Sequence, residues 1–489
     1  MPEIAAPDYQ LARFLIERGI GAIYLIAFVV ALRQFPPLVG EHGLDPATRI
    51  LRATRFWQTP SLFHWRFSDD LVRAVSWIGI VVSAAIVLGL AARAPLPITL
   101  ACWIVLWALY LSIVNVGGRF YGFGWETLLL EAGFLAIFLG NAEVPPPWPV
   151  ILLFRWLTFR VEFGAGLIKL RGDPCWRNLT CMEWHHETQP LANPLSWFFH
   201  HLPRPIHRLE AIGNFVAQLI LPFGLFLPQP FASVAALLLI GTQLYLVVSG
   251  NYAWLNWITI VAAASGLADQ VAPDTVRSFL GLGGTTALET PAWFVVAVVG
   301  LTVLVIVLSY QPVRNLLSPY QAMNASFEPL HLVNTYGAFG TVGRIRYEVI
   351  VEGTEAEELT DDTVWCEYGF KAKPGDPRRV PPQVAPYHLR LDWLMWFLPL
   401  SPAYGDGWFL PFLGRLLLGD RAILALLRSN PFPDRPPVHV RARLFRYRFT
   451  TWAELRQTGA WWHRTYAGVF VPPLRMRPAS LSEDPEGLR

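Results

Sequence analysis

The sequence predicts a polytopic α-helical membrane bundle of about nine spans, followed by a β-rich, β-sandwich-like soluble domain with helical inserts. Three observations predict this class. Hydrophobic residues make up 53% of the 489 residues and charged residues only 15%, against about 25% charged in ordinary globular chains. Charged residues number 36 in 1–310 but 39 in the much shorter stretch 311–489. Finally, the long charge-free apolar runs all lie in the first stretch.

These observations divide the chain into three regions. We expect a multi-pass transmembrane domain over residues 1–310, which contains a polar loop at 171–208. A soluble β-rich domain is expected at 320–475, and the polar tail 476–489 is expected to be disordered. The lipid bilayer is therefore an expected partner. A net charge of +3 is too small to indicate a nucleic-acid partner.

The individual spans follow from the apolar runs, because a helix needs about 20 mostly apolar residues to cross a bilayer. The run 211–268 carries no charged side chain. Prolines at 222, 228 and 230 and the Gly250-Asn251 pair divide it most naturally into three crossings. The other expected spans lie at 19–32, 74–92, 94–118, 126–140, 148–170 and 291–308.

Charged residues inside the predicted spans are concentrated in 119–173. Each costs about 2.5–3.5 kcal/mol on membrane insertion scales, so such residues mark a site or a paired network. Arg155, Glu162 and Lys169 are spaced by seven and share one helix face. An ion-pair network joining helices and a polar cavity within the bundle both remain open. The candidate binding residues in this stretch and just after it are Arg119, Trp125, Glu131, Arg155, Arg160, Arg171, Asp173 and Trp176.

The segment 171–190 reads RGDPCWRNLTCMEWHHETQP and is the most chemically dense of the chain. Cys175 and Cys181 permit three interpretations: a disulfide, buried thiols, or metal ligands together with the adjacent histidines. The spacing of two cysteines by five residues beside paired histidines is not a standard zinc pattern, so we expect no metal. Glu187 and Gln189 are further candidate binding residues.

The soluble part alternates strand and turn signals. Strands are expected at 345–351, 363–370 and 438–450, where apolar and polar residues alternate, and helices at 389–397 and 407–428. The glycine-rich segment 334–340, NTYGAFG, opens this part, and its glycines permit tight turns or close approach of another backbone. Its candidate contact residues are Asn334, Tyr336, Gly337 and Phe339.

Common catalytic signatures are absent from the sequence. It contains no G-x-S-x-G motif, no Walker loop, no HExxH motif and no dinucleotide fingerprint. We therefore expect no cofactor, and the residues alone indicate only a membrane protein with a polar site and a soluble domain.

Five blocks of the sequence resemble the lipase maturation factor family. They are FYGFGWETLLLEAGFL (120–135), GAGLIKLRGDPCWRNLTCMEWHHETQPLANP (164–194), VNTYGAFGTVGRIRYEVIVEGT (333–354), WCEYGFKAKPGDPRRVPPQVAPYHLRLDWLMWF (365–397) and NPFPDRPPVHVRARLFRYRFT (430–450). They occur in the family's order and extend over nearly the whole chain.

The resemblance implies a chaperone-like membrane protein that assists the folding and maturation of secreted clients, which are homodimeric lipases in animals. It also implies a C-terminal domain on the exoplasmic side, in the lumen of the endoplasmic reticulum in eukaryotic members. Arginine-rich loops after the first and fifth spans would place that domain in the cytoplasm instead; we follow the family. An exoplasmic loop favours a Cys175–Cys181 disulfide. Because only three of 39 basic residues are lysine, we expect a GC-rich bacterial source and an inner-membrane location.

A second similarity concerns Lys169. Residues 165–176 contain A-G-L-I-K-L, Asp173 and Trp176, and this block is similar to one in vitamin K-dependent gamma-carboxylase. That similarity implies that Lys169 serves as a base on a lipid- or quinone-like substrate, with Glu126, Glu162 or His185 as partners. Desolvation favours such a role, because burial disfavours the ammonium form of a lysine. An intramembrane enzyme is therefore the alternative to a maturation factor that is not an enzyme.

Overall fold

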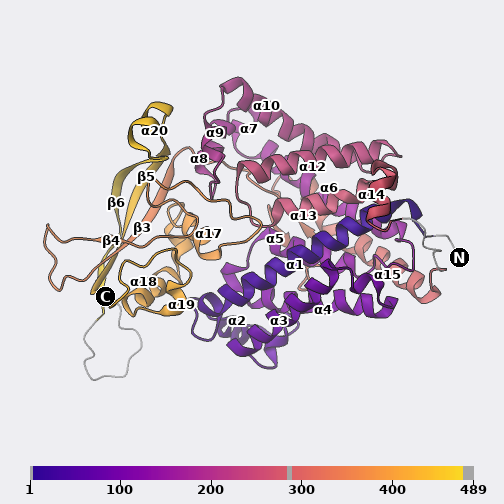
Figure 1. Cartoon of the computed structure of the whole chain (residues 1–489), viewed down its shortest axis with the longest axis horizontal. Helices are drawn as coiled ribbons and strands as arrows, with labels where there is room; N and C mark the ends of the chain where they lie inside the picture. Colours follow the sequence, from indigo (N-terminus) through magenta and orange to yellow (C-terminus); the bar gives the residue numbers. More distant parts are fainter. Residues whose placement is uncertain (1–3, 283–288, 477–489) are drawn as a thin grey trace.

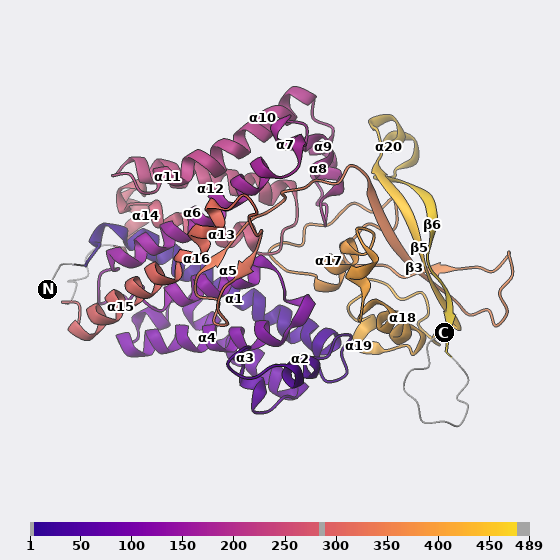
Figure 2. The same cartoon turned by 180° about the vertical axis from the view of Figure 1, so that it is seen from behind.

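The computed structural model describes residues 4–282 and 289–476. A helical bundle forms one end of the molecule, and a smaller region with a β-sheet forms the other end (Figures 1 and 2). The expectation of a disordered tail at 476–489 falls outside the described residues, apart from Met476 itself.

The bundle consists of long helices connected by short ones. The long helices are α1 (Gln10–Val39), α3 (Asp69–Val87), α4 (Leu96–Val116), α5 (Gly124–Ala136), α6 (Trp148–Arg171), α10 (Arg204–Phe215), α12 (Phe231–Ser249), α13 (Leu255–Ala263) and α15 (Ala292–Leu308). The short helices are α2 (Thr48–Ala53), α7 (Pro174–Arg177), α8 (Met182–Thr188), α9 (Ser196–His200), α11 (Leu221–Gly224), α14 (Asp274–Phe279) and α16 (Tyr310–Leu317).

Five helical stretches are long and apolar enough to cross a membrane. They are Pro7–Val39, Asp69–Val87, Leu96–Val116, Phe231–Ser249 and Ala292–Leu317. A helical membrane domain is thus confirmed, but the predicted count of about nine spans is not. The difference arises where predicted spans are short or carry charge: α5 has 13 residues, and α6 holds five charged side chains along its 24 residues.

Local sequence explains where several helices begin. The Ser68 side chain accepts a hydrogen bond from the backbone N–H of Leu71 and so caps the start of α3. Two aspartates follow in the first turn, where their negative charge interacts favourably with the positive end of the helix dipole. Prolines occupy the first turns of α4 and α6, where a missing N–H costs nothing. Large aliphatic residues such as Val296, 65% exposed, form outer surfaces suited to lipid.

The charge-free run 211–268 forms helical segments that its prolines separate. Helix α10 continues through a π-helical turn, η5 (Val216–Ile220), into α11, and α12 and α13 follow. A π-helical turn inside a longer helix is rare and occurs mostly at functional sites. This turn lies against α6, so it marks the part of the bundle where polar side chains meet.

The C-terminal region contains one four-stranded antiparallel sheet with strand order β4-β3-β5-β6. Its strands are β3 (Arg346–Thr354), β4 (Cys366–Glu367), β5 (His439–Phe449) and β6 (Trp462–Arg475); a separate two-stranded ladder pairs β1 (Ala325–Ser326) with β2 (Asn334–Thr335). Its helices are α17 (Arg390–Phe397), α18 (Phe409–Leu417), α19 (Arg421–Leu424) and α20 (Trp452–Thr458).

The strand-containing region is as predicted in outline, but its arrangement differs from a sandwich. Among the described residues one sheet is covered by helices, and no second sheet packs face to face with it. The predicted helix 407–428 is divided at Gly419, which adopts a φ of +62°, a conformation that glycine adopts without strain. The predicted strand 363–370 is reduced to β4.

The two halves of strand β5 pack against different parts of the protein. Val440 and Ala442 are buried in its first half, whereas Phe445, Tyr447 and Phe449 are buried in its second half. The buried side therefore switches from even to odd positions, and the ladder with β6 shifts register between Leu444 and Phe445, as a bulge does. The first half belongs to the main core with α18, and the second half packs against Trp197 of the loop 171–208.

Candidate functional site

Helix α6 carries the buried charges that the sequence places on one face, but each of them has a different partner. The Arg155 guanidinium donates to the carbonyl oxygens of Leu225, at 2.8 Å, and Ser265, at 3.1 Å. These bonds fasten α6 to the ends of α11 and α13. Arg155 is thus a packing residue of the bundle, held without a carboxylate partner among the described residues.

Lys169 lies near the end of α6 and is only 3% exposed. Its Nζ donates to the amide oxygens of Gln218, at 2.7 Å, and Asn214, at 3.1 Å. The ammonium also lies 5.2 Å from the centroid of the Trp176 ring, a favourable distance for a cation–π contact. Within residues 4–282 and 289–476, no carboxylate lies within ion-pair distance of this nitrogen. A buried lysine held by neutral groups is unusual, because burial otherwise demands a paired charge.

Glu162 lies two helical turns before Lys169 and has its own polar partners. Its Oε1 accepts a hydrogen bond from Gln243 Nε2 at 2.7 Å, and the Gln243 amide oxygen accepts one from Asn256 at 2.7 Å. Gly166 lies between the two charged residues, where an added Cβ would come 2.6 Å from Leu219. Glycine at this position therefore permits the close packing of α6 against η5 that delivers Gln218 to Lys169.

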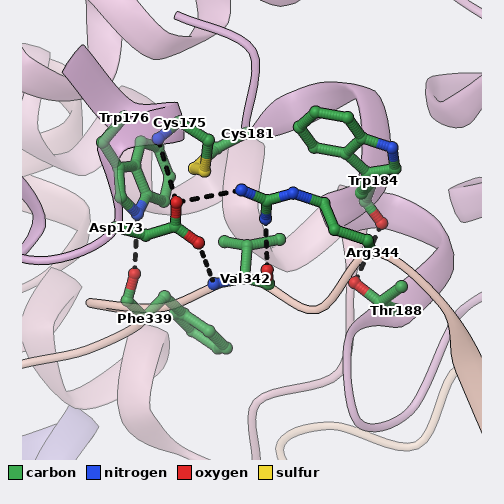
Figure 3. Close-up of a disulfide and its surroundings, with 9 residues drawn as sticks. All are labelled: Asp173, Cys175, Trp176, Cys181, Trp184, Thr188, Phe339, Val342 and Arg344. Atoms are coloured by element: carbon green, nitrogen blue, oxygen red, sulfur yellow. Dashed lines mark hydrogen bonds and ion pairs between the residues drawn. A yellow bond between two sulfur atoms is a disulfide. The ribbon is translucent and has the colours of Figure 1, made fainter. Parts of the chain in front are cut away.

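The loop after α6 (residues 173–181) and the segment 336–344 contact each other beside Lys169, and we call these two segments the roof. Figure 3 shows the contacts between them. Trp176 Nε1 donates to the carbonyl oxygen of Phe339 at 2.9 Å, and the Asp173 N–H donates to that of Gly340 at 2.9 Å. The Asp173 carboxylate accepts hydrogen bonds from Arg344 and from the N–H of Cys175, both at 2.9 Å. Burial opposes its ionisation, but these bonds outweigh burial and lower the pKa of Asp173.

Cys175 and Cys181 are joined by a disulfide in the structure, with their Cα atoms 4.9 Å apart. Both are buried, and they pack with Trp176 and Val342 (Figure 3). The bond closes the turn that presents Trp176 to Lys169 on one side and to Phe339 on the other. It therefore stabilises the roof at the point where the loop meets the C-terminal region.

His185 approaches the roof from α8. Its Nε2 lies 3.0 Å from the Tyr252 hydroxyl, which donates to Gln189 at 2.6 Å, and its ring lies edge-on to Phe339 at 5.1 Å. Burial, together with the nearby His186 and Lys169, lowers the pKa of His185 to about 3. The imidazole is thus neutral at physiological pH and acts as a hydrogen-bonding group.

Two other buried acidic residues join the bundle to the C-terminal region. The Glu131 carboxylate in α5 forms an ion pair with Arg160 of α6 and accepts hydrogen bonds from the Tyr336 hydroxyl at 2.7 Å and from the N–H of Asn334 at 3.0 Å. Arg160 also donates to the Asn334 carbonyl oxygen at 2.6 Å. We call this set, Glu131, Arg160, Asn334 and Tyr336, the first clamp.

The second clamp consists of Glu126, Arg390 and Tyr110. Glu126 Oε1 lies 2.8 Å from Arg390 Nη1, both side chains are fully buried, and the Tyr110 hydroxyl donates to the same carboxylate. Arg390 also donates to the carbonyl oxygen of Phe120 at 2.6 Å and lies over the Tyr121 ring. Since Arg390 begins α17, this clamp fastens the C-terminal region to α5.

The remaining predicted residues lie apart from the buried polar side chains around Glu162 and Lys169. Arg119 is partly exposed and pairs with Asp45 at 3.4 Å, and Trp125 packs edge-on to Trp393. Two more reach the C-terminal region: Arg171 bonds to Gln321 at 3.0 Å, and Glu187 accepts from the N–H of Phe449 at 2.7 Å. Gly337 lies against the backbone of Met323.

The partners of Lys169 and Glu162 were missed by the sequence analysis. Asn214, Gln218, Gln243 and Asn256 are uncharged, so a search for charges inside the spans passes over them. The sequence could have indicated them, because large amide side chains are rare inside apolar spans and face the bundle interior when they occur. Arg390 was also missed, because nothing local to residues 389–397 indicates a partner 264 positions away.

This arrangement defines a class: a helical membrane protein whose polar loop and C-terminal region are fastened over one end of the bundle. Residues 11–274 match the family model of the lipase maturation factor transmembrane domain, and residues 332–472 match that of the lipase maturation factor C-terminal domain. The chain belongs to the lipase maturation factor family.

Individual relatives agree with the family models. Lipase maturation factor 1 of Bos taurus is 39% identical over 96% of this chain and 90% of its own length, and that of Homo sapiens is 38% identical over 96% and 88%. Lipase maturation factor 2 of Homo sapiens is 28% identical over 96% of this chain and 84% of its own length. No solved structure matches the chain.

The disulfide yields a direct test. In the denatured but unreduced chain, a thiol reagent should label Cys102 and Cys366 alone, and reduction should expose Cys175 and Cys181 as well. Replacing Cys175 and Cys181 by serine should lower the free energy of unfolding by about 2 kcal/mol, because the bond restricts a short loop of the unfolded chain. Cys366→Ser is the matched control, with a change below about 0.5 kcal/mol. Labelling of four thiols before reduction would contradict the bond.

Proposed function

We propose that this protein is a membrane-embedded maturation factor that assists the folding of secreted, lipase-type client proteins. The observation that carries the proposal is the family membership of both parts of the chain, together with relatives that bear the name lipase maturation factor. The loop 171–208 and the C-terminal region form the client-facing end. The bundle anchors this end in the membrane.

Surface chemistry of the C-terminal region supports a client-facing role. Strand β6 is at the edge of the sheet, and Tyr466 and Val469 on it are 53% and 63% exposed. Trp452, at the start of the neighbouring helix α20, is half exposed. Aromatic and aliphatic side chains beside an open strand edge suit an incompletely folded partner, which presents apolar side chains and unpaired backbone groups.

The proposed side of the membrane is the exoplasmic one. A disulfide forms and persists in an oxidising compartment, and Cys175 and Cys181 lie in the loop that contacts the C-terminal region. Some of the loop arginines are engaged in contacts: Arg49 with Asp45, and Arg171 with Gln321. Such contacts give them a role other than orienting the chain by the positive-inside rule.

Photo-crosslinking tests the client-facing end. A photoreactive amino acid placed at Tyr466 or Val469 should crosslink a co-expressed secreted lipase during its maturation. Val296 on α15 is the matched control, because it is equally exposed but lies on a predicted lipid-facing surface, and it should give lipid adducts only. Client crosslinks at Val296 that equal those at Tyr466 would contradict the proposal.

A second candidate function is an intramembrane enzyme that uses Lys169 as a base. One observation favours it: the Lys169 amine is buried among amide oxygens and an aromatic ring, with no carboxylate within ion-pair distance among the described residues. Such a lysine loses its proton more readily than a paired one. Glu162 lies on the same helix face, but Glu126 belongs to the second clamp and is committed to Arg390.

Substituting Lys169 separates the two candidates. If the protein is a maturation factor without lysine chemistry, Lys169→Met should leave the activity of the secreted client lipase unchanged at equal expression. A general base contributes about 100-fold or more to a reaction rate, so a loss of that size with the fold intact would establish the enzyme instead. Lys371→Met is the matched control, because Lys371 lies in the C-terminal region and donates to the Ala425 carbonyl oxygen.

A further inference from the structure

A cluster of side chains of the types that bind metal ions lies apart from Glu162 and Lys169 of α6 and their partners. His186 of α8, His207 of α10 and Glu210 of α10 each offer one ligand atom, and these atoms all lie within 4.8 Å of one another. His186 Nε2 is 3.1 Å from Glu210 Oε1, and His207 Nδ1 is 2.7 Å from Glu210 Oε2. His207 and Glu210 are three positions apart on one helix, so they share a face.

The cluster is buried and its carboxylate has no strong cation beside it. His186 is 1% exposed and His207 is 3% exposed. Within the described parts of the chain, no lysine or arginine forms an ion pair with Glu210. A buried carboxylate needs a compensating positive charge, and here only imidazoles and the Tyr245 hydroxyl contact it.

The surroundings of the cluster orient its members. The Tyr245 hydroxyl of α12 donates to Glu210. The second ring nitrogen of His207, Nε2, lies 3.4 Å from the carbonyl oxygen of His200, and the His186 ring stacks on Phe199 at 5.4 Å. A metal-binding histidine commonly donates its other N–H to a carbonyl oxygen, which fixes the ring and the tautomer. His207 has that arrangement.

We propose that His186, His207 and Glu210 bind a divalent transition-metal ion of the zinc type. Zinc binds imidazole nitrogens and carboxylate oxygens at about 2.0–2.2 Å with tetrahedral geometry, which separates neighbouring ligand atoms by about 3.3 Å. The two imidazole nitrogens lie 2.7 and 3.1 Å from different oxygens of Glu210, and the three ligand atoms lie within 4.8 Å of one another, so side-chain rotations bring them to the tetrahedral spacing. A water molecule completes the coordination, the Tyr245 hydroxyl orients the Glu210 carboxylate, and each imidazole binds the ion through a nitrogen that carries no proton.

The ion would connect two helices. Helix α8 lies within the polar loop 171–208, and α10 begins at the end of that loop and continues into the bundle; the two helices pack against each other. Metal binding therefore fixes the loop on the bundle. This role does not depend on the proposed function.

Metal analysis of the full-length chain in detergent tests the site. The protein carries an affinity tag without histidine, is dialysed against a weak chelator with added Zn²⁺, and its zinc content is measured by mass spectrometry. Wild type should retain one ion per chain, and Glu210→Gln and His186→Asn should retain none. His201→Ala is the matched control: it removes a histidine of the same loop that bonds to the Trp197 carbonyl oxygen instead, and zinc should be retained.

Two further measurements keep the test decisive if the ligand variants fail to fold. Tyr245→Phe keeps all three ligands and should weaken zinc binding by about tenfold, the effect typical of outer-shell residues. Wild type loaded with Co²⁺ should show visible d–d bands without a thiolate charge-transfer band, and Zn²⁺ should abolish them. Zinc content equal in wild type and Glu210→Gln, or a cobalt spectrum with thiolate bands, would overturn the proposal.

Discussion

The fold depends on supplying partners for two buried carboxylates, those of Glu126 and Glu131, which lie on the short helix α5 inside the bundle. A buried carboxylate without a partner is costly, because it has lost its hydration without compensation, and the bundle supplies only part of that compensation. Arg160 comes from α6, but Asn334, Tyr336 and Arg390 come from the C-terminal region. The two regions therefore satisfy each other's buried polar groups. A C-terminal domain that is merely tethered would leave Glu126 without its arginine, so we regard the chain as one folding unit.

The same joint determines the environment of Lys169. Trp176 contacts both the lysine and the Phe339 carbonyl oxygen, and the backbone of Gly340 accepts a hydrogen bond from Asp173. Segment 336–344 thus covers the end of α6 only while the clamps hold it there. For a maturation factor, this arrangement supplies a rigid platform at the membrane surface. For an enzyme, it would supply the exclusion of water that a neutral lysine requires.

Much of this could be predicted from the sequence, for identifiable reasons. The scarcity of charge in residues 1–310 indicated the membrane domain, the charges in 119–173 indicated where polar contacts gather, and the five sequence blocks indicated the family. The predicted count of about nine spans is not confirmed: α5 and α6 are apolar in composition yet short or charged, and only Phe231–Ser249 of the run 211–268 is long and apolar enough to span. The partners also escaped prediction, since Glu126 and Arg390 lie 264 positions apart. Strand β6 was not singled out, because its buried and exposed positions do not alternate.

A double-mutant cycle on the second clamp tests the central claim most directly. Glu126→Gln and Arg390→Met should each destabilise the full-length chain in detergent by about 3–5 kcal/mol, because each leaves a buried charge without its partner. The double variant should cost at least about 2 kcal/mol less than the sum of the two, and the bundle and the sheet should unfold in a single transition in every case. Additive costs, or a sheet that unfolds separately from an unaffected bundle, would contradict the account.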